Sequence, residues 1–157
     1  MGMATISGMI IRRGRAPVKN QASSPRRPHI LVVDDDIHTR EMNAAILLRS
    51  GYAVDTAEDG AEAWQALQDA RYDLLITDHQ MPRVTGLELI QKLRSEAMTL
   101  PVILTSGAVP TVELQRLPSL KIDAVVEKPL ALDVFLRTVN ELLSLIEGFP
   151  GERGVSQ

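Results

Sequence analysis

Five short aliphatic runs, spaced between residues 30 and 126, constrain the fold of this chain more than any other feature. Most of them are continuously apolar rather than alternating with polar residues, which is typical of parallel strands buried on both faces. The predicted strands are residues 30–33, 52–57, 74–77, 102–105 and 122–126. We therefore expect a central sheet that is covered by helices on both sides.

The segments between these runs carry helix signals. Asp36 is a suitable N-cap for a helix over about residues 37–50, and Gly51 stands in the usual position after a helix C-terminus. Asp59 and Glu62 form a capping-box pattern at the start of the next helix. Further helices are predicted at about residues 86–96, 111–117 (ended by Pro118) and 132–146. This alternation predicts an α/β fold, a doubly wound five-stranded parallel sheet with strand order 2-1-3-4-5 and five helices.

Four of the predicted strands end on a group from one chemical set. Asp34 and Asp35 follow the first strand and Asp78 follows the third, while Ser106 and Lys128 follow the fourth and fifth. The carboxyl ends of parallel strands meet at one edge of the sheet, and strands one and three are neighbours in the predicted order. The sequence therefore predicts that these five side chains gather at one site.

The chemistry of this set indicates phosphoryl transfer. Crowded carboxylates raise one another's pKa unless a cation neutralises them, and a site made of oxygen ligands favours Mg²⁺. Lys128 and Ser106 can hold two further anionic oxygens, so Asp78 on the central strand is the best candidate for an in-line nucleophile. Seen alone, an acid after a strand is as often only a helix cap. The conjunction of four strand ends carries the prediction.

Length and charge bound the remaining possibilities. The 157 residues suit one folded domain, which we place at residues 29–147 between a disordered basic tail (1–28) and a short tail (148–157). The basic tail is read as solvated, although its Arg- and Ser-rich character also suits contact with an acidic partner or organelle targeting. No apolar run has the roughly 20 residues of a membrane span, and the chain has no cysteine, which suits the cytoplasm. Residues 29–157 carry 11 basic against 20 acidic residues, so no specific nucleic-acid partner is expected.

The strand-end motifs VVDDD, DLLITDHQMPRVTG, PVILTSG and EKP, in this order, resemble the receiver domain of two-component response regulators, the CheY-like proteins. The resemblance covers about residues 28–147. It implies a flavodoxin-like (βα)₅ fold that takes a phosphoryl group from a sensor histidine kinase, or from a histidine phosphotransfer protein, with Mg²⁺. Such a domain catalyses only its own phosphorylation and dephosphorylation. We expect a stand-alone receiver that signals by contact with a downstream protein.

The resemblance also implies a role for each matching residue. The acidic pair and the phosphoacceptor would bind Mg²⁺ together with the backbone carbonyl of Gln80, while a Ser/Thr position and a lysine would contact the phosphoryl group. In this sequence these residues are Asp34 and Asp35, Asp78, Gln80, Ser106 and Lys128. Ser106 is preferred to Thr105 because it stands five residues after Pro101.

The sequence departs from the family pattern on the output side. Val125 stands where many receivers carry a Tyr or Phe that turns inward on activation, and Leu130 replaces the Phe that commonly follows Lys-Pro. Lys121-Ile122 replaces a common Gly-Ala, and Pro110 and Pro118 bracket a short helix. These changes leave the phosphorylation motifs intact and alter the expected output surface.

Two other functions remain as alternatives. One is a receiver-fold binding module that is independent of phosphorylation, which the altered output surface favours. The other is an aspartate-nucleophile phosphatase of the haloacid dehalogenase type, for which residues 34–36 supply the D-x-D pattern. That family also needs Thr or Val two residues after the second Asp and a cap domain, whereas His38 occupies the position here and no length remains for a cap.

Overall fold

The computed structural model describes residues 26–108, 115 and 117–146, and these residues contain one five-stranded sheet in the order β3-β2-β4-β5-β6. Every neighbouring pair of strands is parallel. The strands are β2 (His29–Val33), β3 (Ala53–Ala57), β4 (Leu74–Asp78), β5 (Val102–Ser106) and β6 (Ala124–Glu127). In chain order the arrangement is 2-1-3-4-5, which confirms the predicted topology.

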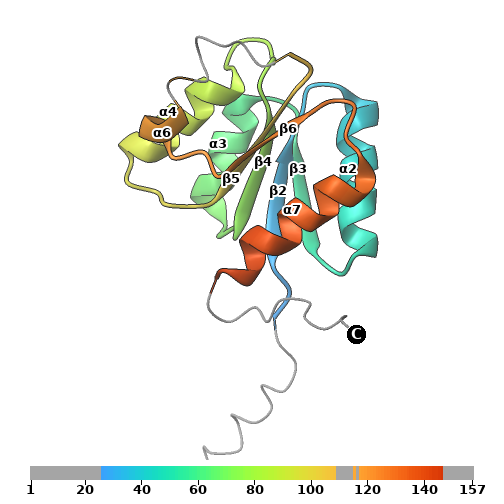
Figure 1. Ribbon diagram of the computed structural model, residues 1–157. Helices are drawn as coiled ribbons and strands as arrows, with labels where there is room; N and C mark the ends of the chain where they lie inside the picture. The colour runs from blue at the N-terminus through green and yellow to red at the C-terminus, as the bar shows by residue number, and fades with distance from the viewer. Residues whose placement is uncertain (1–25, 109–114, 116, 147–157) are drawn as a thin grey trace, which may run out of the picture.

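Helices cover both faces of the sheet. α2 and α7 lie on one face, while α3, α4 and the short α6 lie on the other (Figure 1). The helices are α2 (Ile37–Arg49), α3 (Gly60–Asp69), α4 (Gly86–Ser95), α6 (Leu117–Leu120) and α7 (Leu132–Ser144). The five helices of the described residues agree with the predicted doubly wound α/β fold.

The sheet separates two apolar cores because successive strand residues point to opposite faces. Ile30 and Val32 of β2 join the core beneath α2 and α7, where Phe135 is fully buried. Leu31 and Val33 join the core beneath α3 and α4. Burial on both faces is the reason that these strands are continuously aliphatic in sequence.

The predicted helix caps are largely as observed. The Asp36 carboxylate accepts a hydrogen bond from Thr39 N at 2.8 Å, and Gly51 follows α2 with a φ of 97°. The Asp59 carboxylate accepts from Glu62 N at 2.8 Å, but Glu62 accepts in return from Glu58 N rather than from the N-cap residue. Only the forward half of that capping box therefore forms.

The region before β6 differs from the prediction. Residues 111–114 and 116 lie outside the described residues, so most of the predicted helix at 111–117 does too. Pro118 does not end a helix but lies in the first turn of α6, where a missing N–H leaves no helical bond unmade. Lys121 has a φ of 56°, and this left-handed turn delays the last strand to Ala124 instead of residue 122.

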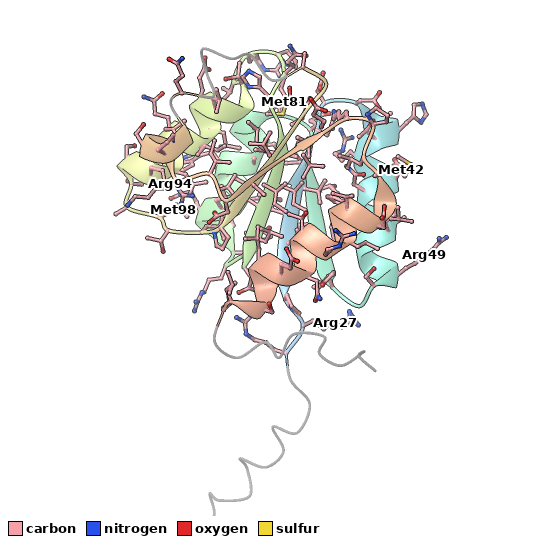
Figure 2. All side chains as sticks on the ribbon, in the orientation of Figure 1. Arg27, Met42, Arg49, Met81, Arg94 and Met98 are labelled. Atoms are coloured by element: carbon pink, nitrogen blue, oxygen red, sulfur yellow. The ribbon has the colours of Figure 1, made fainter. Side chains whose placement is uncertain are left out.

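Arg94 of α4 joins the elements around α6. Its guanidinium donates hydrogen bonds to four carbonyl oxygens, those of Met98, Leu100, Leu120 and Lys121, at 2.7–2.9 Å. Arg94 and Met98 lie together in Figure 2. Because the carbonyls belong to the segment before β5 and to the end of α6 with the residue after it, this one side chain ties both regions to α4.

At the opposite end of the chain, the approach to β2 is held to the domain. Arg26 forms an ion pair with Asp73 at 2.9 Å, and the carbonyl of Pro28 accepts from Ala53 N. Of the predicted tails at residues 1–28 and 148–157, residues 1–25 and 148–157 lie outside the described residues, and residues 26–28 make the contacts just named. Among the residues that the structure describes, no helix is long and apolar enough to cross a membrane.

Candidate functional site

The carboxyl edge of the sheet brings the predicted site residues to one end of the molecule. Asp34 directly follows β2, Asp78 is the last residue of β4, and these two strands are neighbours with Val33 opposite Thr77. Figure 2 shows Met81, which follows β4, at this end, whereas Arg27 before β2 lies at the other. Ser106 ends β5 at the same edge, and Lys128 directly follows β6.

Three carboxylates form an acidic group at the centre of this edge. Asp34, Asp35 and Asp78 each place an oxygen within 4.8 Å of the others. Asp34 and Asp78 are buried, at 2% and 5% exposure, while Asp35 is exposed. The group is thus open to solvent on one side and enclosed by the sheet on the other.

Lys128 bridges two of these carboxylates. Its ammonium nitrogen lies 3.0 Å from Asp34 Oδ2 and 3.0 Å from Asp78 Oδ1. Asp34 Oδ1 in turn accepts from Asp36 N at 2.9 Å, which fixes the carboxylate. A single ammonium therefore faces three carboxylates, which leaves the centre of the site with an excess of negative charge.

The pKa values follow from this imbalance. Burial raises the pKa of Asp78; Lys128 opposes the shift, and the charges of Asp34 and Asp35 add to it. Burial acts to lower the pKa of Lys128, but its bonds to Asp34 and Asp78 outweigh that effect and raise it. At neutral pH the ammonium is therefore charged, whereas burial and the neighbouring carboxylates disfavour the ionised form of Asp78.

Asp78→Asn is therefore expected to stabilise the metal-free protein. Folding raises the pKa of Asp78, so the free energy of unfolding depends on the protonation of this carboxyl group. The stabilisation is fully present below about pH 4, the pKa of an unfolded aspartate, and is lost as the pH rises through the pKa in the folded protein. At pH 7 the substitution should raise Tm by about 3 °C in buffer with a chelator, measured by thermal unfolding. Mg²⁺ should then raise the Tm of the wild type more than that of the variant. A metal-free variant that unfolds below the wild type would contradict this.

Ser106 is at the predicted place, but its hydroxyl is engaged elsewhere. The side chain is fully buried, and Oγ donates to Ala108 O at 2.9 Å and accepts from Ala108 N at 3.2 Å. Its carbonyl accepts from Lys128 N at 2.9 Å, which joins the ends of β5 and β6. Thr105, the residue not preferred, points its hydroxyl at Thr77 O. The hydroxyl of Ser106 must leave Ala108 to reach a group bound at Asp78.

Gln80 lies in the loop between β4 and α4, two residues after Asp78, and is exposed. With His79, Met81 and Glu88 it lines a cavity of about 510 Å³ between this loop and α4. Gly86 closes the loop, since its N–H donates to His79 O at 2.9 Å. A Cβ at Gly86 would lie 2.3 Å from Asp78 O, so only glycine allows this close return.

Two arginines at the site's border were not singled out from the sequence. Arg40 donates to the carbonyl oxygen of Asp34 at 2.6 Å, and the guanidinium of Arg83 bonds the carboxylate of Asp59. Arg40 lies one helical turn after Asp36, so the predicted helix start could have suggested it. Nothing in the local sequence links Arg83 to Asp59, because the contact joins separate loops.

The donor set fits a hard divalent cation such as Mg²⁺. The acidic group offers only oxygen atoms, one of its carboxylates is open to solvent, and a single ammonium leaves its charge uncompensated. Asp34, Asp35 and Asp78 would hold the ion, which would neutralise charge on a transferring phosphoryl group.

Comparison with known proteins agrees with this geometry. A family model described as the response regulator receiver domain matches residues 30–140. The chain is 33% identical over 135 residues to the gliding motility regulatory protein of Myxococcus xanthus, covering 84% of this chain and 17% of that protein. It is 37% identical over 114 residues to the response regulator MprA of Mycobacterium ulcerans, covering 73% of this chain and 49% of that protein. The chain thus spans half or less of these relatives.

A solved structure shares the fold over most of its length. The crystal structure of a response regulator receiver protein from Pseudomonas putida aligns with a TM-score of 0.71 and 32% identity. The alignment covers 74% of this chain and 98% of the Pseudomonas chain.

Proposed function

This chain belongs to the response regulator receiver domain family of two-component signalling, and from this premise we propose that Asp78 is its phosphoacceptor. Phosphorylation of an aspartate and binding of Mg²⁺ are general properties of that family. In this chain we assign Asp34, Asp35, Asp78 and the backbone carbonyl of Gln80 to the metal. Lys128 and Ser106 are assigned to the phosphoryl oxygens.

One observation carries the proposal: the ammonium of Lys128 lies 3.0 Å from both Asp34 and Asp78. An ammonium in that place can pair with the carboxylate of Asp78 before transfer and with the oxygens of a phosphoryl group on Asp78 after transfer. A lysine that served only as a helix or turn residue would not need to contact two buried carboxylates.

In the proposed reaction, an oxygen of the Asp78 carboxylate attacks the phosphorus of a phosphohistidine. The new O–P bond forms as the P–N bond breaks, and the electron pair stays on the imidazole nitrogen, which takes up a proton. The product is an acyl phosphate on Asp78 and a neutral histidine. Reversal returns the phosphoryl group to the histidine nitrogen, and attack of water on the phosphorus releases it as inorganic phosphate; both return Asp78 to a carboxylate.

The donor that this chemistry requires is a sensor histidine kinase or a histidine phosphotransfer protein. We place the reaction in the cytoplasm and the output in contact with a downstream protein, without a specific nucleic-acid partner. The family membership supports the donor class, and the excess of acidic residues in residues 29–157 argues against a nucleic-acid surface.

A small phosphate donor tests the proposal without a partner protein. The full chain is incubated with acetyl phosphate and Mg²⁺, and intact mass is followed with and without a chelator. We expect an adduct with the mass of one phosphoryl group that needs Mg²⁺. Steady turnover of several phosphate esters would instead support a phosphatase, and no adduct under any of these conditions would favour a phosphorylation-independent binding module.

The altered output position gives a further prediction. Val125 lies opposite Leu104 in the β5–β6 pair and packs with the core beneath α3 and α4. A β-branched side chain has one favoured χ1 and cannot sweep into space vacated by Ser106 as a large ring would. Beryllofluoride with Mg²⁺ should therefore shift amide resonances strongly at Asp35, Asp78 and Ser106 but only modestly at Val125 and Leu130. Large shifts that spread outward from Val125 would refute this.

A further inference from the structure

The loop between β4 and α4 is fastened to the start of α3. The guanidinium of Arg83 bonds one oxygen of the Asp59 carboxylate, and the other oxygen caps α3 by accepting from Glu62 N at 2.8 Å. Next to this contact, Val84 packs directly over Gly60, where a Cβ would meet Val84 Cγ1 at 2.5 Å. Two adjacent residues of the loop thus sit on two adjacent residues of the helix start.

The backbone of Arg83 has an unusual conformation next to this contact. Arg83 has a φ of 67°, a left-handed conformation that residues with a Cβ rarely adopt unless their surroundings hold them there. Its side chain is 67% exposed, so burial in a core does not explain that conformation. The Asp59 side chain is only 11% exposed and gives Arg83 a fixed partner.

The loop that is held in this way carries Gln80. Gln80 is exposed, and it stands between the buried Asp78 and the turn at Pro82 and Arg83. The pKa of Asp59 is lowered by its bonds from Glu62 N and Arg83, so at neutral pH the partner of Arg83 is a carboxylate. Asp59 is outside the acidic group of Asp34, Asp35 and Asp78, and its contact with Arg83 links it to the loop that carries Gln80.

From these contacts we infer that Arg83 is a positioning residue: its bond to Asp59 sets the loop so that the Gln80 carbonyl faces the acidic group and Mg²⁺ binds tightly. This inference rests on the proposed function, because the Gln80 carbonyl has a role only if the site takes the ion. The inference also identifies the start of α3, on the sheet face opposite α2 and α7, as part of the metal site's support. Residues that orient metal ligands commonly change affinity for the ion by about 10-fold or more when removed.

The experiment measures Mg²⁺ affinity by calorimetric titration of the full chain with MgCl₂. Arg83→Gln removes the guanidinium group. Asp59→Asn removes the carboxylate but keeps a residue that can cap α3. Each should weaken Mg²⁺ binding by about 10-fold, and the double variant should be no weaker than either single variant. Arg83→Lys should recover part of the affinity. Arg137→Gln is the matched control, since Arg137 is 61% exposed and pairs with Asp133 within α7; its affinity should equal that of the wild type.

A second readout separates positioning from a general loss of structure. At saturating Mg²⁺ the rate of phosphoryl uptake from acetyl phosphate by Arg83→Gln should return to within about twofold of the wild type, because only the affinity for the ion is impaired. The inference would be overturned if Arg83→Gln bound Mg²⁺ as tightly as the wild type. The proposed function would still stand in that case, provided that the wild type takes up the phosphoryl group. A wild type that binds no Mg²⁺ would overturn both.

Discussion

Replacing Asp78 by asparagine is expected to abolish phosphoryl uptake completely. The amide keeps the size of the side chain but is a very poor nucleophile, and it cannot form an acyl phosphate. Asp34 is buried beside it and bonded to Lys128 and to Asp36 N, so it should not substitute for Asp78. Asp35 is exposed and is the carboxylate most able to compete.

The intact mass of Asp78→Asn after incubation with acetyl phosphate and Mg²⁺ should therefore equal that of the untreated variant. Asp69→Asn is a suitable control, because Asp69 ends α3 and its carboxylate accepts hydrogen bonds from Gln65, one turn earlier in the same helix. This control should take up phosphate like the wild type. Full uptake by Asp78→Asn would remove Asp78 from its assigned role.

Replacing Lys128 by alanine is expected to slow phosphoryl uptake by about 100-fold, the usual effect of removing one charged or hydrogen-bonding group from developing charge. The loss has two causes. The transferring oxygens lose their ammonium partner, and Asp34 and Asp78 lose the cation that bridges them at 3.0 Å. Lys128→Arg keeps the charge but replaces a compact donor by a planar fork, so its rate should lie between those of alanine and lysine.

The rates are compared by quenching the acetyl phosphate reaction at intervals and measuring intact mass. Far-ultraviolet circular dichroism and thermal unfolding show whether Lys128→Ala stays folded, and the comparison is made at a temperature where it does. A rate for Lys128→Ala close to that of the wild type would show that the bridge between the two carboxylates has no part in transfer.

The sequence sufficed for the sheet and for the identity of the groups at its edge. Continuous aliphatic runs predict strands that are covered on both faces, and Ile30, Leu31 and Ile76 accordingly lie in the two cores on either side of the sheet. The predicted strand order puts Asp34 beside Asp78, and β2 and β4 are indeed neighbours. Local pattern and topology together determine these features.

Contacts between separate loops could not be predicted in the same way. The turn of the Ser106 hydroxyl to Ala108 depends on backbone positions after β5, and the Arg83–Asp59 contact joins residues with no common periodicity. Lys121 adopts a left-handed conformation at the position where the family that this sequence resembles commonly has a glycine. Tertiary contacts hold Lys121 in this unfavourable backbone conformation, among them the hydrogen bond from Arg94 to the Lys121 carbonyl.

The most direct test of the account is the location of the phosphoryl group on the wild-type chain. Borohydride reduces an acyl phosphate of aspartate to homoserine, so treatment after incubation with acetyl phosphate and Mg²⁺ marks the modified residue permanently. Peptide mass spectrometry should then find homoserine at position 78 alone, and a chelator present throughout should prevent it. Homoserine at Asp34 or Asp35, with residue 78 unchanged, would contradict the assignment of Asp78 as phosphoacceptor.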